Sequence, residues 1–427
     1  MLRKIIVVCT LFVTVLSIAQ KNNTSAYSFF GVGDKNDAMS VEQLSMGGVA
    51  VAFSDAYHLN FANAASNSSL LFTTYTMALE NMNMTAKDAN NKENAATTFL
   101  SYIAVGIPFA DKGGMAFGLL PNSTVGYSII SNITDVENNT LEATQYTGEG
   151  GTNKVFLNFA YKPLKDLSIG VQGNYVFGKI ENNIINQVKD VALATRYQTI
   201  SYVKGFSVSA GFQYKKKINE KIELNLGGSF DLENTVTSDG NEYLYSVVLA
   251  NSLSPRDTIV NNSSSGKIIT PLKSTVGIGI GKENKWFAGV DYSTQEPIKL
   301  QGDIASQFSK ISYDKYSRIS VGGFYLPKIN SISSYWERVT YRAGIKYENT
   351  GLMVDGNGNG TDFTPIKDFG ISFGVGLPLS KQLSNLNVGF EIGKRGETAN
   401  GLVQENYINF RLSMSLNDKW FKKVEIF

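Results

Sequence analysis

The chain of 427 residues is poor in the residues on which most enzyme and metal sites depend. It has a single cysteine, Cys9, and a single histidine, His58, so it offers no disulfide framework, no Cys/His catalytic pair and no metal site built from these residues. Nucleophile elbows, phosphate-binding glycine loops and paired-carboxylate signatures are also missing from the sequence. These absences predict a protein that is not an enzyme and that carries no metal and no cofactor.

The first nineteen residues have the pattern of a cleaved export signal, with a basic start at Arg3 and Lys4, an apolar run and a small-x-small site ending at Ala19. A lipoprotein signal is the alternative, but Cys9 lies inside the apolar run rather than after it. We therefore expect residues 1–19 to be a signal peptide. Its removal leaves equal numbers of basic and acidic residues, which argues against a nucleic-acid partner.

Charged residues make up only 18% of the chain, below the roughly 25% typical of soluble domains, while glycine, tyrosine and phenylalanine are plentiful. Segments of about ten residues alternate between apolar and polar, for example Phe206–Lys215 and Ile408–Leu416. Aromatic residues mark their ends. A soluble β-sandwich would also alternate, but its strands are usually shorter. The pattern is typical of strands that cross a membrane as a β-barrel.

Counting these segments predicts an all-β fold, a 14-stranded antiparallel transmembrane β-barrel over residues 69–416. An even number of strands places both ends of the wall in the periplasm, so residues 417–427 are expected as a periplasmic C-terminal tail. The connections alternate between short polar turns and longer stretches, of which 131–152, 236–267 and 350–365 are expected as external loops. We expect this barrel in the outer membrane of a Gram-negative cell, with Phe373, Phe390 and Phe410 facing the lipid.

Residues 20–68 precede the first strand and are rich in small, apolar and turn-forming residues. They could fold inside the lumen as a hatch or plug, or hang in the periplasm as a tail. Their length and apolar content favour the N-terminal lumenal hatch. His58 lies in this stretch without a carboxylate partner recognisable from spacing, so we expect it to be structural.

The chain resembles the FadL-like outer-membrane transporters of long-chain fatty acids and aromatic hydrocarbons. Members share a Gly-x-Ala-x-Ala, Asp, Asn-Pro-Ala pattern near the end of the hatch, and the matching positions here are Gly48, Ala50, Ala52, Asp55, Asn63, Ala64 and Ala65. Ala64 stands where the family has proline. Residues 27–34 and 417–421 resemble the branch of the family found in Bacteroidetes. The resemblance implies a channel for a hydrophobic or amphipathic small molecule. Some Bacteroidetes members instead serve as accessory or scaffold barrels of the type nine secretion translocon, which is the alternative.

A proline interrupts the third expected strand, at Pro121, and proline cannot donate to a strand ladder. The resemblance implies a kink there and a lateral opening into the bilayer, with Phe117, Leu119 and Leu120 near its edge. The alternative is that the strand ends near Leu120 and Pro121 opens an external loop.

Charged residues also fall on the inward, polar faces of the expected strands. The candidates for anchoring a ligand head group are Arg318, Arg342, Lys346 and Arg411. The competing interpretation, which we favour, is that they pair with other groups inside a wet lumen. Residues 355–360 have the start of a calcium loop, but Ile366 stands where the bidentate glutamate belongs, so we expect a flexible external loop.

Overall fold

The computed structural model describes residues 25–29, 33–89, 91–109, 112–137, 139–249, 255–306, 311–379 and 384–418. The predicted signal peptide and most of the predicted C-terminal tail lie outside these ranges. Among the described residues, no helix has the length and apolar character needed to cross a bilayer.

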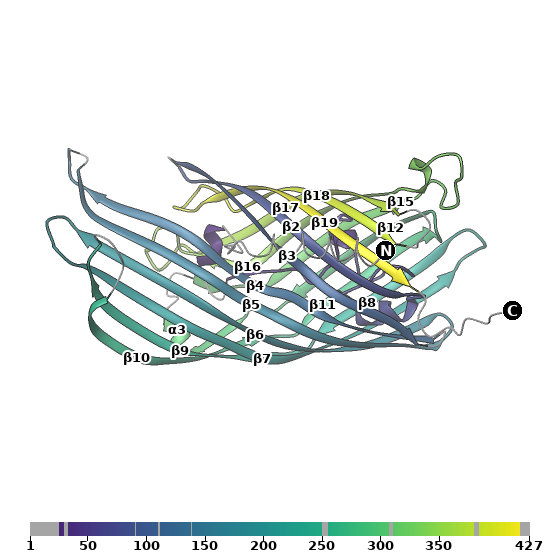
Figure 1. Ribbon diagram of the computed structural model, residues 1–427, viewed down its shortest axis with the longest axis horizontal. Helices are drawn as coiled ribbons and strands as arrows, with labels where there is room; N and C mark the ends of the chain where they lie inside the picture. The colour runs from purple at the N-terminus through teal and green to yellow at the C-terminus, as the bar shows by residue number, and fades with distance from the viewer. Residues whose placement is uncertain are drawn as a thin grey trace, which may run out of the picture.

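The wall of the molecule is a closed antiparallel β-barrel of 14 strands (Figure 1), which confirms the predicted fold. It closes where β19 pairs with β2, with Asp418 opposite Thr73, so both ends of the wall lie at the same end of the barrel. Ten strands are continuous: β2 (Thr73–Lys87), β3 (Lys92–Phe109), β4 (Gly113–Thr134), β5 (Thr140–Leu164), β6 (Leu167–Val188), β7 (Ala194–Lys217), β16 (Thr340–Val354), β17 (Thr364–Pro378), β18 (Asn385–Arg395) and β19 (Gln404–Asp418).

The other four wall strands are each broken into two labelled pieces. These are β8 (Glu223–Asp231) with β9 (Asn234–Val247), β10 (Pro255–Thr270) with β11 (Lys273–Lys282), β12 (Trp286–Gln295) with β13 (Lys299–Gly302), and β14 (Ile311–Tyr313) with β15 (Tyr316–Tyr325). Two short helices, α3 (Asp303–Ser306) and η4 (Trp336–Arg338), lie in the connections.

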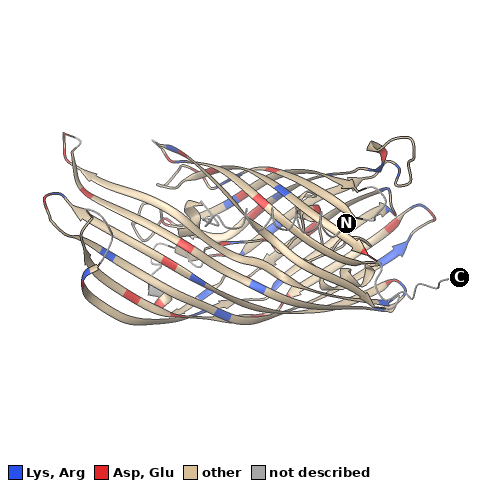
Figure 2. Ribbon diagram, in the orientation of Figure 1, with Lys and Arg blue, Asp and Glu red and all other residues tan. Residues whose placement is uncertain are grey.

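Side chains alternate across the wall, apolar outward and polar inward. Phe373, Phe390 and Phe410 are 52%, 46% and 37% exposed, whereas their inward neighbours Ser372 and Glu391 are each 1% exposed. An apolar outer surface of this extent is stable only against hydrocarbon, so these phenylalanines face lipid as predicted. Charged residues are visible in the turns and loops at both ends of the barrel (Figure 2). The chain is an outer-membrane protein.

The wall is much taller on one side, where β4 to β7, β9 and β10 reach further left in Figure 1 than the other strands. β5 has 25 residues, about 80 Å of extended chain, whereas a tilted membrane strand needs only about ten residues. The expectation of external loops at 131–152 and 236–267 is therefore wrong. Above the membrane both faces of a strand meet water, so the backbone ladder continues without the apolar alternation that reveals it in a sequence.

The N-terminal segment, of which residues 25–29 and 33–70 are described, lies against the inward face of this wall. It contains η1 (Ala26–Phe29), β1 (Asp34–Lys35), α2 (Val41–Leu44) and η2 (Ala64–Ser69). α2 begins with a capping box in which Ser40 and Gln43 each bond the other's backbone N–H. Inward glycines of the wall let the two backbones approach: a Cβ on Gly227 would lie 2.0 Å from the carbonyl oxygen of Val51. Side chains there would displace the segment.

Candidate functional site

The first half of the family pattern is a tightly packed bend in the N-terminal segment. Gly48 has φ +88°, and a Cβ there would lie 2.1 Å from the guanidinium of Arg318, so only glycine fits. Ala50 and Ala52 are fully buried. The backbone N–H groups of Ala50 and Val51 donate to one carboxylate oxygen of Asp291 on β12, at 2.7 and 2.9 Å. Asp291 therefore ties this bend to the wall.

The second half of the pattern caps η2. The side-chain oxygen of Asn63 accepts the N–H of Ala65, and its amide nitrogen donates to the carbonyl oxygens of Val51 and Phe212, at 2.8 and 3.0 Å. Ala64 and Ala65 are buried. Because Ala64 occupies the first helical position, where proline is favoured but not required, the Asn63 cap sets the helix start without it.

His58 does have carboxylate partners, which corrects the sequence interpretation. Its Nδ1 lies 2.8 Å from Asp55 and its Nε2 lies 3.7 Å from Glu42. Burial alone lowers the pKa of His58, but the two carboxylates outweigh it and hold this pKa above its ordinary value. Glu42 in turn accepts hydrogen bonds from Asn387 and Ser413 on the wall. The contact between His58 and Asp55 joins residues three apart in a loop, where no periodic pattern in the sequence predicts it.

The four predicted lumenal cations lie inside the barrel and are engaged by other groups. Arg318 contacts Asp37 and Glu348, and its guanidinium also donates to the Gly47 carbonyl oxygen. Lys346 pairs with Asp368 and Glu391, at 3.3 and 2.8 Å.

Arg411 pairs with Glu80 at 2.8 Å and with Glu391 at 2.5 Å. Arg342 donates to Asn387 at 3.1 Å. Arg395, which joins Asp34 of the N-terminal segment to Glu405 of β19, belongs to the same group. These cations link the segment to the wall and neighbouring strands to one another.

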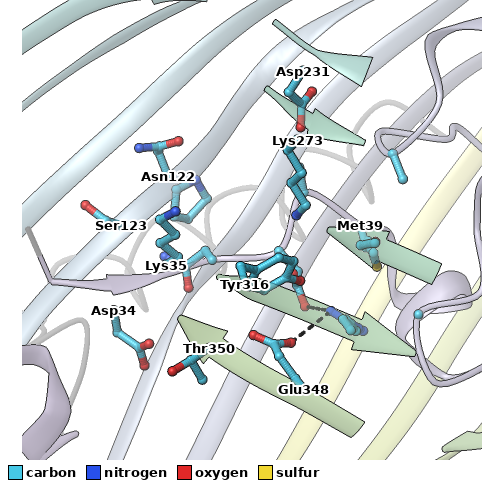
Figure 3. A pocket seen from close by; sticks show the side chains of 18 of the residues that line it. Asp34, Lys35, Met39, Asn122, Ser123, Asp231, Lys273, Tyr316, Glu348 and Thr350 are labelled. Carbon is cyan, nitrogen blue, oxygen red and sulfur yellow. Dashed lines mark hydrogen bonds and ion pairs between the residues drawn. The ribbon is translucent and has the colours of Figure 1, made fainter. Parts of the chain in front are cut away.

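A cavity of about 430 Å³ lies between the N-terminal segment and the wall (Figure 3). Charged and hydroxyl side chains cover much of it, among them Lys35, Lys273 and Tyr316. Apolar side chains from β2, β3 and the segment line another part, including Met82, Phe99 and Phe61. The cavity is therefore amphipathic. Within the described ranges, no group of three or more His, Cys, Asp or Glu side chains is arranged to hold a metal ion.

Next to this cavity, β3 and β4 are paired over only part of their length. Their ladder runs from Phe109 opposite Gly113 to Ile103 opposite Leu119, and no further pair joins them in the described part of the chain. Beyond that point, β1 occupies the edge of β4, with Lys35 opposite Ser123. On its other edge β4 stays paired with β5, with a register shift just after Pro121.

Pro121 thus lies inside a continuous strand, two residues beyond the last β3 pair. Phe117 is 41% exposed on the outer face, whereas Leu120 is buried in an inner apolar cluster with Phe61 and Phe156. The idea that Pro121 opens an external loop is wrong, because β4 continues to Thr134.

The loop with the calcium-like start is organised by its own aspartate. The carboxylate of Asp355 accepts the backbone N–H groups of Gly358, Asn359 and Gly360. An Asx-type turn of this kind explains the Asp/Asn/Gly composition without a bound ion.

The closed wall, the apolar belt and the inner N-terminal segment define an outer-membrane β-barrel of the FadL type. The structure is similar to the Pseudomonas putida toluene transporter TodX, with a TM-score of 0.59 and 12% identity over 91% of this chain and 100% of that one. It is similar to a Pseudomonas aeruginosa FadL homologue, with a TM-score of 0.59 and 10% identity over 90% and 99% of the two chains. For the CymD monoaromatic hydrocarbon channel the TM-score is 0.55, with 12% identity over 90% and 99%.

The chain belongs to the BamG family, whose model matches residues 1–426. A comparison with curated protein sequences gave no match.

Proposed function

We propose that this protein is an outer-membrane channel that carries small hydrophobic or amphipathic molecules from the lumen sideways into the bilayer. The observation that carries the proposal is the unpaired stretch between β3 and β4 above Leu119, which borders the lumenal cavity. A missing ladder in a barrel wall leaves a passage that side chains can line or fill. The solved structures with this fold include a toluene transporter and a monoaromatic hydrocarbon channel by name, which is consistent with the same class of solute.

Lateral release suits such a solute on physical grounds. Each methylene kept out of water lowers the free energy by about 0.8 kcal/mol, so an alkyl chain moves directly from a partly apolar lumen into the membrane at no hydration cost. Crossing the aqueous periplasm would lose that energy.

The N-terminal segment acts as the gate in this proposal. β1 covers the edge of β4 that β3 leaves unpaired, and the ion pair between Asp34 and Arg395 helps to hold it there. Since the contact between β1 and β4 spans only two residue pairs, it can be released without breaking the wall. Movement of β1 would connect the cavity to the gap.

Replacing Pro121 with valine tests the route. Valine restores a backbone donor and favours strand pairing, so the β3–β4 ladder should extend and the gap should narrow. We expect uptake of a labelled alkyl or aromatic compound by cells that depend on this protein to fall severalfold. The matched control is Pro108→Val, since Pro108 lies in β3 where the ladder with β4 is complete, opposite Gly114.

Amide hydrogen exchange across residues 115–125 would establish whether the ladder has extended, and heat-modifiable migration in a gel would establish that the barrel has assembled. Unchanged uptake in an assembled Pro121→Val variant with an extended ladder would contradict the lateral route. An accessory role in a secretion translocon would then be the better hypothesis.

A further inference from the structure

The cations that line the lumenal cavity divide into two groups. Arg318, Lys346, Arg395 and Arg411 each have two carboxylate partners within 4.0 Å. Lys35, Lys154 and Lys273 line the same cavity, and none of them has a carboxylate within that distance among the described residues. We refer to these three residues as the lysine trio. Because Arg318, Arg395 and Arg411 are already neutralised, the lysine trio, which has no ion pair among the described residues, is available to a ligand.

The trio comes from three separate elements of the cavity lining. Lys35 is on β1 and faces Ser123 of β4, while Lys154 is on β5, opposite Leu120 of the same strand. Lys273 begins β11 and is the ladder partner of Asp231 on β8. The carboxylate of Asp231 accepts the Ser209 hydroxyl at 2.6 Å.

The Lys273 ammonium turns the other way, to 4.9 Å from the centre of the Tyr316 ring (Figure 3). The Lys273 ammonium is therefore directed away from its ladder partner Asp231.

Two further observations support an anion-binding role for the trio. The side-chain nitrogen of Asn36, next to Lys35 and in the wall of the cavity, is buried without an acceptor in the described part of the chain. Burial, and then the positive charge of Lys273, lower the pKa of Lys35 to about 8, although the carboxylates of Glu348 and Asp231 act in the opposite direction. Both an unused donor and mutual repulsion between cations would be relieved by an oxyanion at this place.

We propose that the lysine trio and Asn36 bind the phosphate-type head group of an amphiphile whose apolar tail lies along Met82, Phe99 and Phe61. This inference rests on the proposed channel function and specifies its solute. A lysine ammonium is a compact charge with three donors, and three of them together suit an anion with several oxygens and more than one negative charge. A phosphate monoester carries about −1.5 to −2 charges at neutral pH, so it neutralises more of the trio than a carboxylate can.

The position of the site also fits release through the wall. Phe99 belongs to β3 and Met82 to β2, on the side of the cavity that borders the unpaired stretch of β3 and β4. A tail on these residues points toward the gap, while the head group contacts β1, which covers the edge of β4. Binding therefore engages the element that has to move.

Binding of soluble C8 amphiphiles to the purified full-length protein in a neutral maltoside detergent tests the site. Isothermal titration would compare octyl phosphate, octanoate, octyl glucoside and inorganic phosphate. We expect octyl phosphate to bind at least about tenfold more tightly than the other three, because only it supplies both a multivalent oxyanion and a tail. Lys35→Gln, Lys154→Gln and Lys273→Gln should each weaken it by about tenfold, and the triple variant should bind it no better than octyl glucoside.

Lys273→Arg, which keeps the charge, should retain most of the affinity, and Lys204→Gln is the matched control, since Lys204 pairs with Asp239 on exposed strand surface. Unchanged binding by the assembled triple variant would overturn the site. Equal affinity for octanoate would overturn the assignment of the head group, and equal affinity for inorganic phosphate would overturn the role of the tail. Because the assay measures binding without uptake, its failure is distinguishable from failure of the lateral route.

Discussion

Replacing Asp291 with alanine should release the N-terminal segment from the wall. Asp291 is 4% exposed, and one of its carboxylate oxygens accepts the N–H groups of both Ala50 and Val51. Hydrogen bonds to a charged group contribute about 1.5–3 kcal/mol each, and the variant leaves two buried N–H groups without an acceptor. Their combined loss is about 3–6 kcal/mol, which corresponds to an increase of roughly two to four powers of ten in the local opening constant.

Amide hydrogen exchange, resolved at Ala50 and Val51 in detergent or in lipid nanodiscs, measures this opening directly. The matched control is Asp239→Ala, which removes an exposed acid paired with Lys204 on the tall side of the wall and should leave both amides protected. If Ala50 and Val51 exchange no faster in an assembled Asp291→Ala barrel than in the parent protein, then Asp291 does not hold the segment and the gate described here is wrong.

Three further outcomes follow from the same geometry. Phe410→Arg places a cation in the lipid-facing belt and should lower the free energy of unfolding by roughly 2–4 kcal/mol in urea titrations in lipid vesicles, whereas no change would place Phe410 outside the bilayer. His58 faces Asp55, Glu42, Arg342 and Asn387, and its pKa in the folded protein is raised above the ordinary value of about 6.5. The protonated His58 therefore stabilises the folded segment fully below about pH 6.5, and this contribution is lost as pH rises through the pKa of the folded state. Protease resistance of residues 40–65 should therefore weaken as pH rises above neutrality, and His58→Gln should remove that step; a step that survives in the variant would assign it to another group. Lys35 faces Lys273, Glu348 and Asp231, and its pKa is about 8. Because only the protonated ammonium attracts an anion, the affinity for octyl phosphate should fall as pH rises through 8. Lys35→Gln should flatten this pH profile.

The wall was predictable from the sequence because lipid imposes a strict period of two. Phe373, Phe390 and Phe410 indicate the outer face, and the polar residues that alternate with them indicate the face toward the lumen. The same reasoning failed above the membrane. From Ile130 to Thr134 every residue is exposed, so nothing in the pattern separates this end of a paired strand from a loop.

Most of the candidate site was not predictable, because it is made by tertiary contacts rather than by spacing. Inward orientation of Arg318 and Arg411 follows from alternation, but their partners Asp37 and Glu80 come from elements far away in the chain. The distinction between paired arginines and the lysine trio appears only when all the carboxylates are placed. The inward position of Lys35 could not be predicted, because β1 has only two residues and so shows no alternation of polar and apolar residues.

The central proposal is that solute passes from the lumenal cavity through the gap between β3 and β4. Photolabelling can test this passage with an alkyl phosphate that carries a diazirine at the end of its tail. The probe would be added outside intact cells that carry the protein, with and without excess octyl phosphate, and the adducts would be mapped by mass spectrometry. We expect adducts at Met82, Phe99 and Leu120 that octyl phosphate suppresses and that decrease in Pro121→Val. Labelling restricted to the outer belt at Phe390 and Phe410, unaffected by the competitor, would contradict it.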